Sequence, residues 1–161
     1  SASGKAHEED TRIATLVERA TSKEIPTIGI GDNGNEIGFG KIEDAVRDIQ
    51  PHGDSCQCPC EQGNACRVAT DHLIVANTSN WGAYGIQAML ALCTKMPDAM
   101  HTPTDERRML EYNVLAGAND GRHDRPIMKV DGTSEETQAG VIAMLNDIVN
   151  ISMSEVPDRG F

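Results

Sequence analysis

Apolar side chains recur three and four positions apart in several segments of the chain, which is the spacing of amphipathic helices. Ile42, Ala45, Val46 and Ile49 show this pattern most clearly, and Pro51 ends the helix that they predict. The predicted helices lie near residues 9–21, 42–49, 81–96, 103–117 and 134–151.

Two of these helices are preceded by residues that can cap them. Thr102-Pro-Thr-Asp105 and Thr133-Ser-Glu-Glu136 both match the capping box, in which a hydroxyl and an acidic side chain three positions later satisfy the first N–H groups of a helix. Proline at position 103, the first helical position, strengthens the first of the two predictions.

Three short aliphatic runs, Ile25–Ile30, Leu73–Ala76 and Ile127–Val130, predict strands. Each run leads into a polar loop and then into a helix. If the strands are parallel, right-handed connections bring these loops to one edge of the sheet, where ligands bind. The loops are Gly31–Glu36, Asn77–Asn80 and Asp131–Glu135.

The alternation of strands and helices predicts an α/β fold with a three-layer, mostly parallel sheet flanked by helices. Three strands make a thin sheet, and a parallel sheet normally needs both of its faces covered. We therefore expect residues 1–161 to form a single α/β domain that is the later part of a larger domain, with flexible ends at 1–8 and 152–161.

Charge and composition exclude several classes of function. The 161 residues carry a formal net charge of −11, and 3% of them are aromatic. A chain this acidic is not expected to bind nucleic acid or an anionic membrane surface. No apolar run approaches the length that spans a bilayer, and no signal peptide is expected at the start of the chain.

Four of the five cysteines lie close together, at positions 56, 58, 60 and 66. An odd count without a secretory signal favours reduced thiols. Structural zinc sites use cysteine pairs with wider spacing, so the C-x-C-x-C-x5-C pattern predicts no obligatory metal. We interpret the cluster as a redox-sensitive surface loop, with metal binding as the alternative.

The glycine-rich segment Gly29-Ile-Gly-Asp-Asn-Gly34 matches the G-x-G-x-x-G pattern of dinucleotide-binding loops. However, Asp32 and Glu36 would place negative charge beside a pyrophosphate, which argues against that use. The loop suits a cationic amine, a polarised amide or a metal ion. A glycine turn with an Asx cap is the structural alternative.

The second loop, Asn77-Thr-Ser-Asn-Trp-Gly82, places small polar side chains at a helix start. Ser79 or Asn80 can serve as the N-cap, and the free N–H groups there can also receive a carboxylate. Trp81, the only tryptophan, either lines a pocket or packs in the core.

Two long motifs, in this order, resemble the D-glutamate cyclase family, and more narrowly the C-terminal domain of its vertebrate mitochondrial members. The first is Thr27-Ile-Gly-Ile-Gly-Asp-Asn-Gly-Asn-Glu-Ile-Gly-Phe-Gly40. The second combines Thr70-Asp71 and Leu73-Ile-Val-Ala76 with Ser79-Asn-Trp-Gly-Ala-Tyr84. The resemblance covers roughly residues 25–150. Asn33 stands where the family often has a glycine, and the cysteine-rich loop is atypical of the family.

The resemblance implies a lyase of D-amino acid metabolism in the mitochondrial matrix, which converts D-glutamate to 5-oxo-D-proline and water. No cofactor is implied. Asp32 or Glu36 would bind the substrate ammonium and act as the base. The other candidate residues would bind the amino-acid substrate. They are Asn33, Gly34, Asn35, Thr70, Asp71, Ser79, Asn80 and Trp81.

A second hypothesis is a non-catalytic amino-acid-binding or interaction module of a larger enzyme. Under both hypotheses, we predict that loops Gly31–Glu36 and Asn77–Asn80 form one pocket, because each follows one of two neighbouring strands and precedes a helix.

Overall fold

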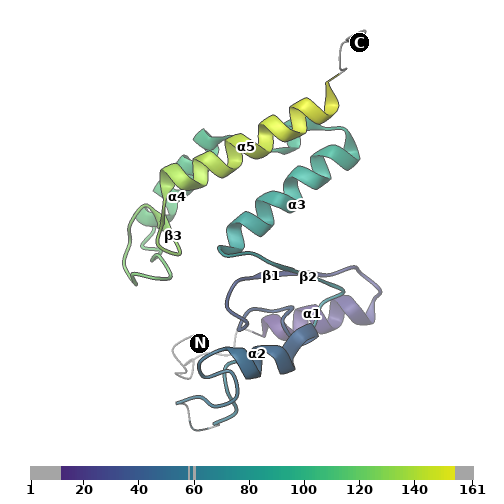
Figure 1. Cartoon of the computed structure of the whole chain (residues 1–161), viewed down its shortest axis with the longest axis vertical. Helices are drawn as coiled ribbons and strands as arrows, with labels where there is room; N and C mark the ends of the chain where they lie inside the picture. Colours follow the sequence, from purple (N-terminus) through teal and green to yellow (C-terminus); the bar gives the residue numbers. More distant parts are fainter. Residues whose placement is uncertain (1–11, 58, 60, 155–161) are drawn as a thin grey trace. The chain divides into compact units, whose positions relative to one another are not determined.

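The computed structural model describes residues 12–57, 59 and 61–154. Contacts divide the chain into two compact units, Ser1–Gly82 and Ala83–Phe161. In the described residues, the first unit carries a pair of parallel strands, and the second is mainly helical (Figure 1).

The first unit confirms the helices and strands expected there. Strand β1 begins at Ile28 and not at Ile25, because the Ile25 N–H bonds to the Ala20 carbonyl and Pro26 has no N–H. The elements are α1 (Ile13–Ser22), β1 (Ile28–Gly31), η1 (Gly40–Ile42), α2 (Glu43–Ile49), β2 (His72–Val75) and the start of α3 (Ser79–Thr94).

Strands β1 and β2 pair in parallel, as predicted, with Ile28 opposite His72 and Gly31 opposite Val75. The Ala76 N–H adds one more bond to the Gly31 carbonyl, at 3.1 Å. Because the strands are parallel, the loops that follow them leave from the same edge of the sheet.

One face of this strand pair lies against the start of α3. A Cβ atom on Gly82 would lie 2.9 Å from Cγ2 of Ile30 and 3.2 Å from Cγ2 of Ile74. Both distances are shorter than ordinary contacts, so only glycine lets the first turn of α3 approach the strands this closely.

The opposite face is covered by residues 36–39. A Cβ atom on Gly29 would lie 2.6 Å from the Gly38 Cα, and one on Gly31 would lie 2.6 Å from the Phe39 ring. Phe39 packs with Val46 and Ala65 in the core of the unit. These two glycines of the G-x-G-x-x-G pattern therefore make room for the chain's own backbone and ring.

In its described residues, the second unit has three helices, a short 3-10 helix and a hairpin. Helices α4 and α5 pack side by side (Figure 1), and Ala88, Ala91 and Met100 pack against Val149 in the core. Besides α3, the elements are η2 (Pro97–Ala99), α4 (Pro103–Leu115), β3 (Lys129–Val130), β4 (Thr133–Ser134) and α5 (Glu135–Met153).

The first predicted capping box is confirmed and the second is shifted. Thr102 accepts a bond from the Asp105 N–H, and Asp105 accepts one from the Thr102 N–H. The hydroxyl and N–H of Thr102 also hold the pKa of Asp105 below its usual value. At α5 the cap is Ser134 and not Thr133, because the Thr133 hydroxyl donates to the Val130 carbonyl at 2.6 Å.

The predicted third parallel strand, Ile127–Val130, is wrong. Only Lys129 and Val130 form a strand, β3, and it pairs with β4 in an antiparallel hairpin. Asp131 and Gly132, at the turn, have φ values of 48° and 82°. Two positive φ values are typical of a tight hairpin turn, for which Asp-Gly is a favoured sequence. The segment Asp131–Glu135 therefore does not follow a parallel strand, as the prediction required.

The structure confirms a mixed α/β fold but not a three-layer, mostly parallel sheet. In the described part of the chain, the parallel sheet has two strands. The single-domain assignment stays a prediction, and the expected flexible ends fall mostly on residues 1–11 and 155–161, outside the described residues. Among the helices that the structure describes, none is long and apolar enough to cross a membrane.

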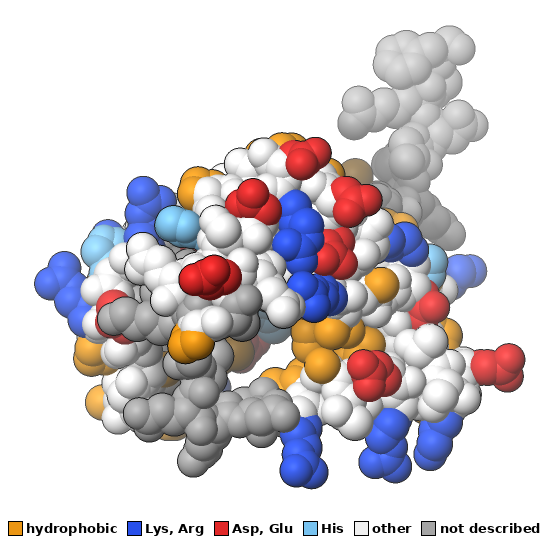
Figure 2. Space-filling model, turned by 90° about the horizontal axis from the view of Figure 1, so that it is seen from below, with side chains coloured by type: hydrophobic (Ala, Val, Ile, Leu, Met, Phe, Trp, Pro, Cys, Tyr) orange, Lys and Arg blue, Asp and Glu red, His pale blue; other side chains and the backbone are white. Residues whose placement is uncertain are grey.

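Large hydrophobic side chains remain exposed in both units, and several are visible as orange atoms in Figure 2. Ile28 and Val75, at the two ends of the strand pair, are 50% and 57% exposed. On α5, Met144, Ile148 and Ile151 are exposed at positions i, i+4 and i+7. Because many large hydrophobic side chains are exposed, the hydrophobic core that stabilises each unit is small.

A buried carboxylate organises the loop between α4 and β3. Asp120 accepts bonds from the Gly132 N–H (2.9 Å), the His123 N–H (2.9 Å) and the His123 Nδ1 (2.6 Å). Burial alone would raise the pKa of Asp120, but these donors outweigh it and hold the pKa below its usual value. The stability that the ionised group contributes is therefore present above about pH 4 and is lost as the pH falls through the lowered folded pKa.

Asp120→Asn should destabilise the second unit by about 1–3 kcal/mol at neutral pH, because the new NH2 group would face the donors. The variant should also lose less stability between pH 5 and pH 2 than the wild type, in thermal unfolding followed by circular dichroism. Asp124→Asn, an exposed change in the same loop, should stay within about 0.5 kcal/mol of the wild type. If Asp120→Asn lost as much stability between pH 5 and pH 2 as the wild type, the ionised Asp120 would not be a source of the acid sensitivity.

Gly29→Ala should destabilise the first unit by about 1–3 kcal/mol, because the added methyl group meets the backbone of residues 37–38. Denaturant unfolding followed by Trp81 fluorescence measures the effect. Gly85→Ala in α3 is the control, since its Cβ has nothing within 4 Å and alanine favours a helix by up to about 1 kcal/mol. If Gly29→Ala were as stable as the wild type, residues 36–39 would be able to move and accommodate the added methyl group.

Candidate functional site

The loops after β1 and β2 meet at one edge of the strand pair, as the sequence predicted. Asp32 Oδ2 accepts a bond from the Ser79 N–H at the start of α3, at 3.1 Å. Asp32 Oδ1 accepts one from the side-chain amide of Asn33, at 2.6 Å. Asp32 therefore caps α3 from a distant part of the sequence, and its negative charge suits the positive end of the helix dipole. That the loops enclose one pocket stays a prediction.

The second candidate acid, Glu36, turns back over its own loop. Its carboxylate accepts bonds from the Gly34 N–H, at 2.9 Å, and from the Asn33 N–H, at 3.3 Å to each oxygen. Backbone N–H groups that a pyrophosphate would need are thus already occupied by a carboxylate. This geometry agrees with the sequence argument against a dinucleotide.

Both the steric surroundings and the backbone conformation of Gly34 require a glycine at this position. Its φ is +92°, and a Cβ atom there would lie 2.4 Å from Cγ1 of Val46 on α2. The position therefore accepts only glycine, and the loop packs directly on α2.

Neutral polar side chains surround the two acids. Asn35, Ser79 and Asn80 are half-buried and Asn33 is exposed. In the described residues, no hydrogen bond engages the side-chain amides of Asn35 and Asn80. These amides carry both donors and acceptors, so they can bind a carboxylate or an ammonium group.

The position before α3 is also polar and more deeply buried. Thr78 is 1% exposed, and its hydroxyl has no hydrogen-bond partner among the described residues. Its carbonyl accepts a bond from the N–H of Trp81, which is half-buried.

Thr70 and Asp71 lie at the opposite end of the strands. The Thr70 hydroxyl accepts from the Gly29 N–H (3.1 Å) and donates to the His72 carbonyl (2.7 Å). Asp71 accepts from both the hydroxyl and the N–H of Thr27, at 2.8 and 2.7 Å, and these bonds hold the pKa of Asp71 below its usual value. The structure therefore does not bring these two residues to the loops that carry Asp32 and Glu36.

The cysteine cluster is only partly described. Cys56 and Cys66 are half-buried, and Cys58 and Cys60 lie outside the described residues. No group of three potential metal ligands occurs among the residues that the structure does describe. The absence of an obligatory metal stays a prediction.

A cavity of about 510 Å³ lies beside α1 and residues 67–69, where Val17, Glu18 and Arg67 line it. It contains none of the candidate residues, and it is wide open to solvent. The loops at the carboxyl ends of β1 and β2 remain the better candidate, because acidic and amide groups converge there.

The family is decided by comparison with known proteins. The sequence profile described as D-glutamate cyclase-like, C-terminal, matches residues 6–146. The chain belongs to this family. The mitochondrial D-glutamate cyclase of Homo sapiens is 42% identical over 72 residues, which are 43% of this chain and 10% of the human protein. The match thus spans about a tenth of that relative's length.

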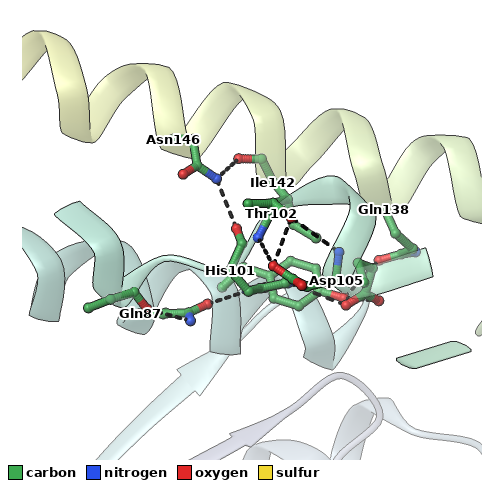
Figure 3. Close-up of polar contacts among 10 residues, drawn as sticks. Gln87, His101, Thr102, Asp105, Gln138, Ile142 and Asn146 are labelled. Atoms are coloured by element: carbon green, nitrogen blue, oxygen red, sulfur yellow. Dashed lines mark hydrogen bonds and ion pairs between the residues drawn. The ribbon is translucent and has the colours of Figure 1, made fainter. Parts of the chain in front are cut away.

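Sequence reasoning missed a buried polar cluster in the second unit of this family member. Tyr84, Glu106 and Gln138 are buried, and His101 lies beside Glu106; Figure 3 shows His101 and Gln138 of this cluster. One signal was available. Gln138 lies at i−4 from Ile142, so a polar residue occupies the apolar register of α5. Glu106 stands in the same relation to Leu110 on α4.

Asp32→Ala should destabilise the start of α3 by about 0.5–2 kcal/mol, the usual cost of losing an N-cap acceptor. Amide hydrogen exchange at Ser79 should become faster. Asp32→Asn retains an acceptor oxygen and should lose less. Unchanged exchange at Ser79 in Asp32→Ala would show that Asp32 does not cap the helix.

Proposed function

We propose that this chain is the part of a D-glutamate cyclase that converts D-glutamate to 5-oxo-D-proline and water. Family membership over residues 6–146 is the observation that carries the proposal. The loop geometry supports it, since two carboxylates stand beside neutral amides at a sheet edge, an arrangement that suits a zwitterionic amino acid.

The reaction requires three kinds of group. The substrate amine must lose a proton before its nitrogen attacks the γ-carboxyl carbon, an acid must help expel oxygen as water, and donors must stabilise the oxyanion that forms. Binding the substrate in a folded conformation, with amine and carboxyl carbon close together, supplies much of the acceleration.

Asp32 or Glu36 would bind the ammonium group and act as the base. Both side chains are half-buried, and backbone N–H groups hold them, from the same loop for Glu36 and from the start of α3 for Asp32, so neither has to be ordered when substrate binds. In this proposal, the substrate carboxylates contact the side chains of Asn33, Asn35 and Asn80.

The remaining candidates shape the site. Gly34 and Ser79 would position the two acids, because their N–H groups donate to Glu36 and Asp32, and Trp81 would line the pocket. Thr70 and Asp71 would act indirectly, because their bonds to Gly29 and Thr27 hold β1 against β2. The proposal includes no cofactor.

The human relative carries the description "mitochondrial" in its name. By this relationship, we propose the mitochondrial matrix as the location of the present protein. We also propose that the three-layer, mostly parallel sheet belongs to the complete domain of the parent enzyme, in which further strands extend the pair β1 and β2.

A second candidate function is an amino-acid-binding or interaction module whose catalysis lies elsewhere in the parent protein. It is favoured by the shortness of the match, a tenth of the relative's length. Incubation of the purified chain and of the parent enzyme with D-glutamate, with chromatographic detection of 5-oxo-D-proline, separates the two. Product from the parent enzyme alone, together with D-glutamate binding by the chain, would support the module.

In the parent enzyme, Glu36→Gln or Asp32→Asn should lower kcat about a hundredfold or more if that residue is the base, the usual scale of general acid–base catalysis. Asp48→Asn, an exposed change on α2, should leave kcat unchanged. Wild-type kcat in both loop variants would refute the catalytic assignment.

A further inference from the structure

The buried polar cluster of the second unit has no place in the proposed chemistry. Glu106 on α4 is 0% exposed, and its Oε1 lies 2.6 Å from the hydroxyl oxygen of Tyr84 on α3. Its Oε2 lies 3.3 Å from Nε2 of His101, whose side chain is 20% exposed. This separation fits an ion pair, although the two atoms do not meet hydrogen-bond geometry. A buried carboxylate is costly unless it is paired, so the state of His101 decides whether this cluster is stable.

Gln87 fixes the proton on one nitrogen of the His101 ring. The Gln87 Nε2 donates to the Ala99 carbonyl at 2.7 Å, so its Oε1 faces His101 Nδ1, at 2.6 Å (Figure 3). An amide oxygen can only accept, and Nδ1 must therefore carry a hydrogen. Nε2 then carries a hydrogen only if the ring is a charged imidazolium.

The hydrogen atoms on the other side of Glu106 can be assigned in the same way. The Thr133 hydroxyl donates to the Val130 carbonyl, so it accepts from the Gln138 Nε2. The Gln138 Oε1 consequently faces the Tyr84 hydroxyl, at 3.5 Å. The single hydroxyl hydrogen of Tyr84 is best directed at the nearer acceptor, Glu106 Oε1. A hydrogen between His101 Nε2 and Glu106 Oε2 must then belong to that pair.

Charged and neutral groups from α3, α4 and α5 surround His101. Asp105, one residue before Glu106, interacts electrostatically with His101. Arg107 is paired with Glu135 of α5, at 2.6 Å. From α5, the neutral side chains of Gln138 and Asn146 face the cluster, and from α3 Tyr84 and Gln87 do so.

We propose that one proton on His101 pairs this ring with Glu106 and so fixes the connection between α3 and α4, and that loss of this proton at alkaline pH loosens the connection. With the proton, imidazolium and carboxylate neutralise each other. Without it, two lone pairs face each other across 3.3 Å and the buried carboxylate has no counter-charge. The same connection is tied to α5, because Asn146 Nδ2 donates to the His101 carbonyl at 3.0 Å.

The sign of the pH effect follows from proton counting. If the pairing with Glu106 keeps on His101 a proton that the unfolded chain releases, as proposed, stability falls as the pH rises.

Nitrogen NMR of the wild-type chain tests the protonation state directly. At pH 7, both ring nitrogens of His101 should show the shifts of protonated nitrogen. A neutral ring with a lone pair on Nε2 would overturn the proposal, whatever the behaviour of any variant.

Glu106→Gln tests the link to stability. The new amide can donate to a neutral His101 Nε2 and accept from Tyr84, so the cluster is satisfied without the extra proton. The wild type should lose several degrees of Tm between pH 7 and pH 9 in excess of the loss in Glu106→Gln. His72→Gln, which alters an exposed histidine, should keep the wild-type loss. An equal loss in wild type and Glu106→Gln would overturn the proposal; if Glu106→Gln does not fold, the NMR result decides.

Discussion

The contact between residues 36–39 and the bare backbone of β1 is the constraint on which the candidate site depends. Gly29 and Gly31 have no side chains on this face, so Gly38 and the Phe39 ring lie directly on the strand. This close approach brings Glu36 back over Gly31 and lets its carboxylate reach the Gly34 N–H. The position of one candidate acid is therefore a result of backbone packing.

The other candidate acid is placed by a different interaction. Asp32 bonds to the Ser79 N–H, and this bond joins two loops that are 47 positions apart in the sequence. Both acids are thus held by structural hydrogen bonds before any ligand arrives. Such preorganisation is favourable for catalysis, because little free energy is spent on ordering the groups during the reaction.

The strand pair and most helices could be predicted from the sequence because their signals are local. The aliphatic runs around Ile28 and Leu73, the proline at position 51 and the Thr102 capping box each determine nearby backbone. The adjacency of the two loops followed from parallel pairing, which a general rule of α/β folds supplies.

The error in the third predicted strand arose because a short apolar run is followed by a turn-forming sequence. Ile127–Val130 resembles a strand, yet the Asp131–Gly132 turn folds it into a hairpin with β4. The location of Thr70 and Asp71 could not be predicted, for another reason. Proximity to β2 in the sequence does not show at which end of the strand a side chain makes its hydrogen bonds. Both residues form theirs at the amino end. The cluster around Glu106 depends on contacts among three helices, which no local pattern encodes.

The glycines of the first loop have a consequence for the interpretation of sequence motifs. In a nucleotide-binding loop, glycines admit a phosphate; in this loop they admit the protein's own chain. Both situations produce the same glycine pattern in the sequence. A search for this pattern alone would therefore predict a nucleotide in a loop whose space is occupied by the protein's own chain. The residues that separate the two cases are the ones that take the vacant space, here Glu36 and Phe39, which lie beyond the end of the G-x-G-x-x-G pattern.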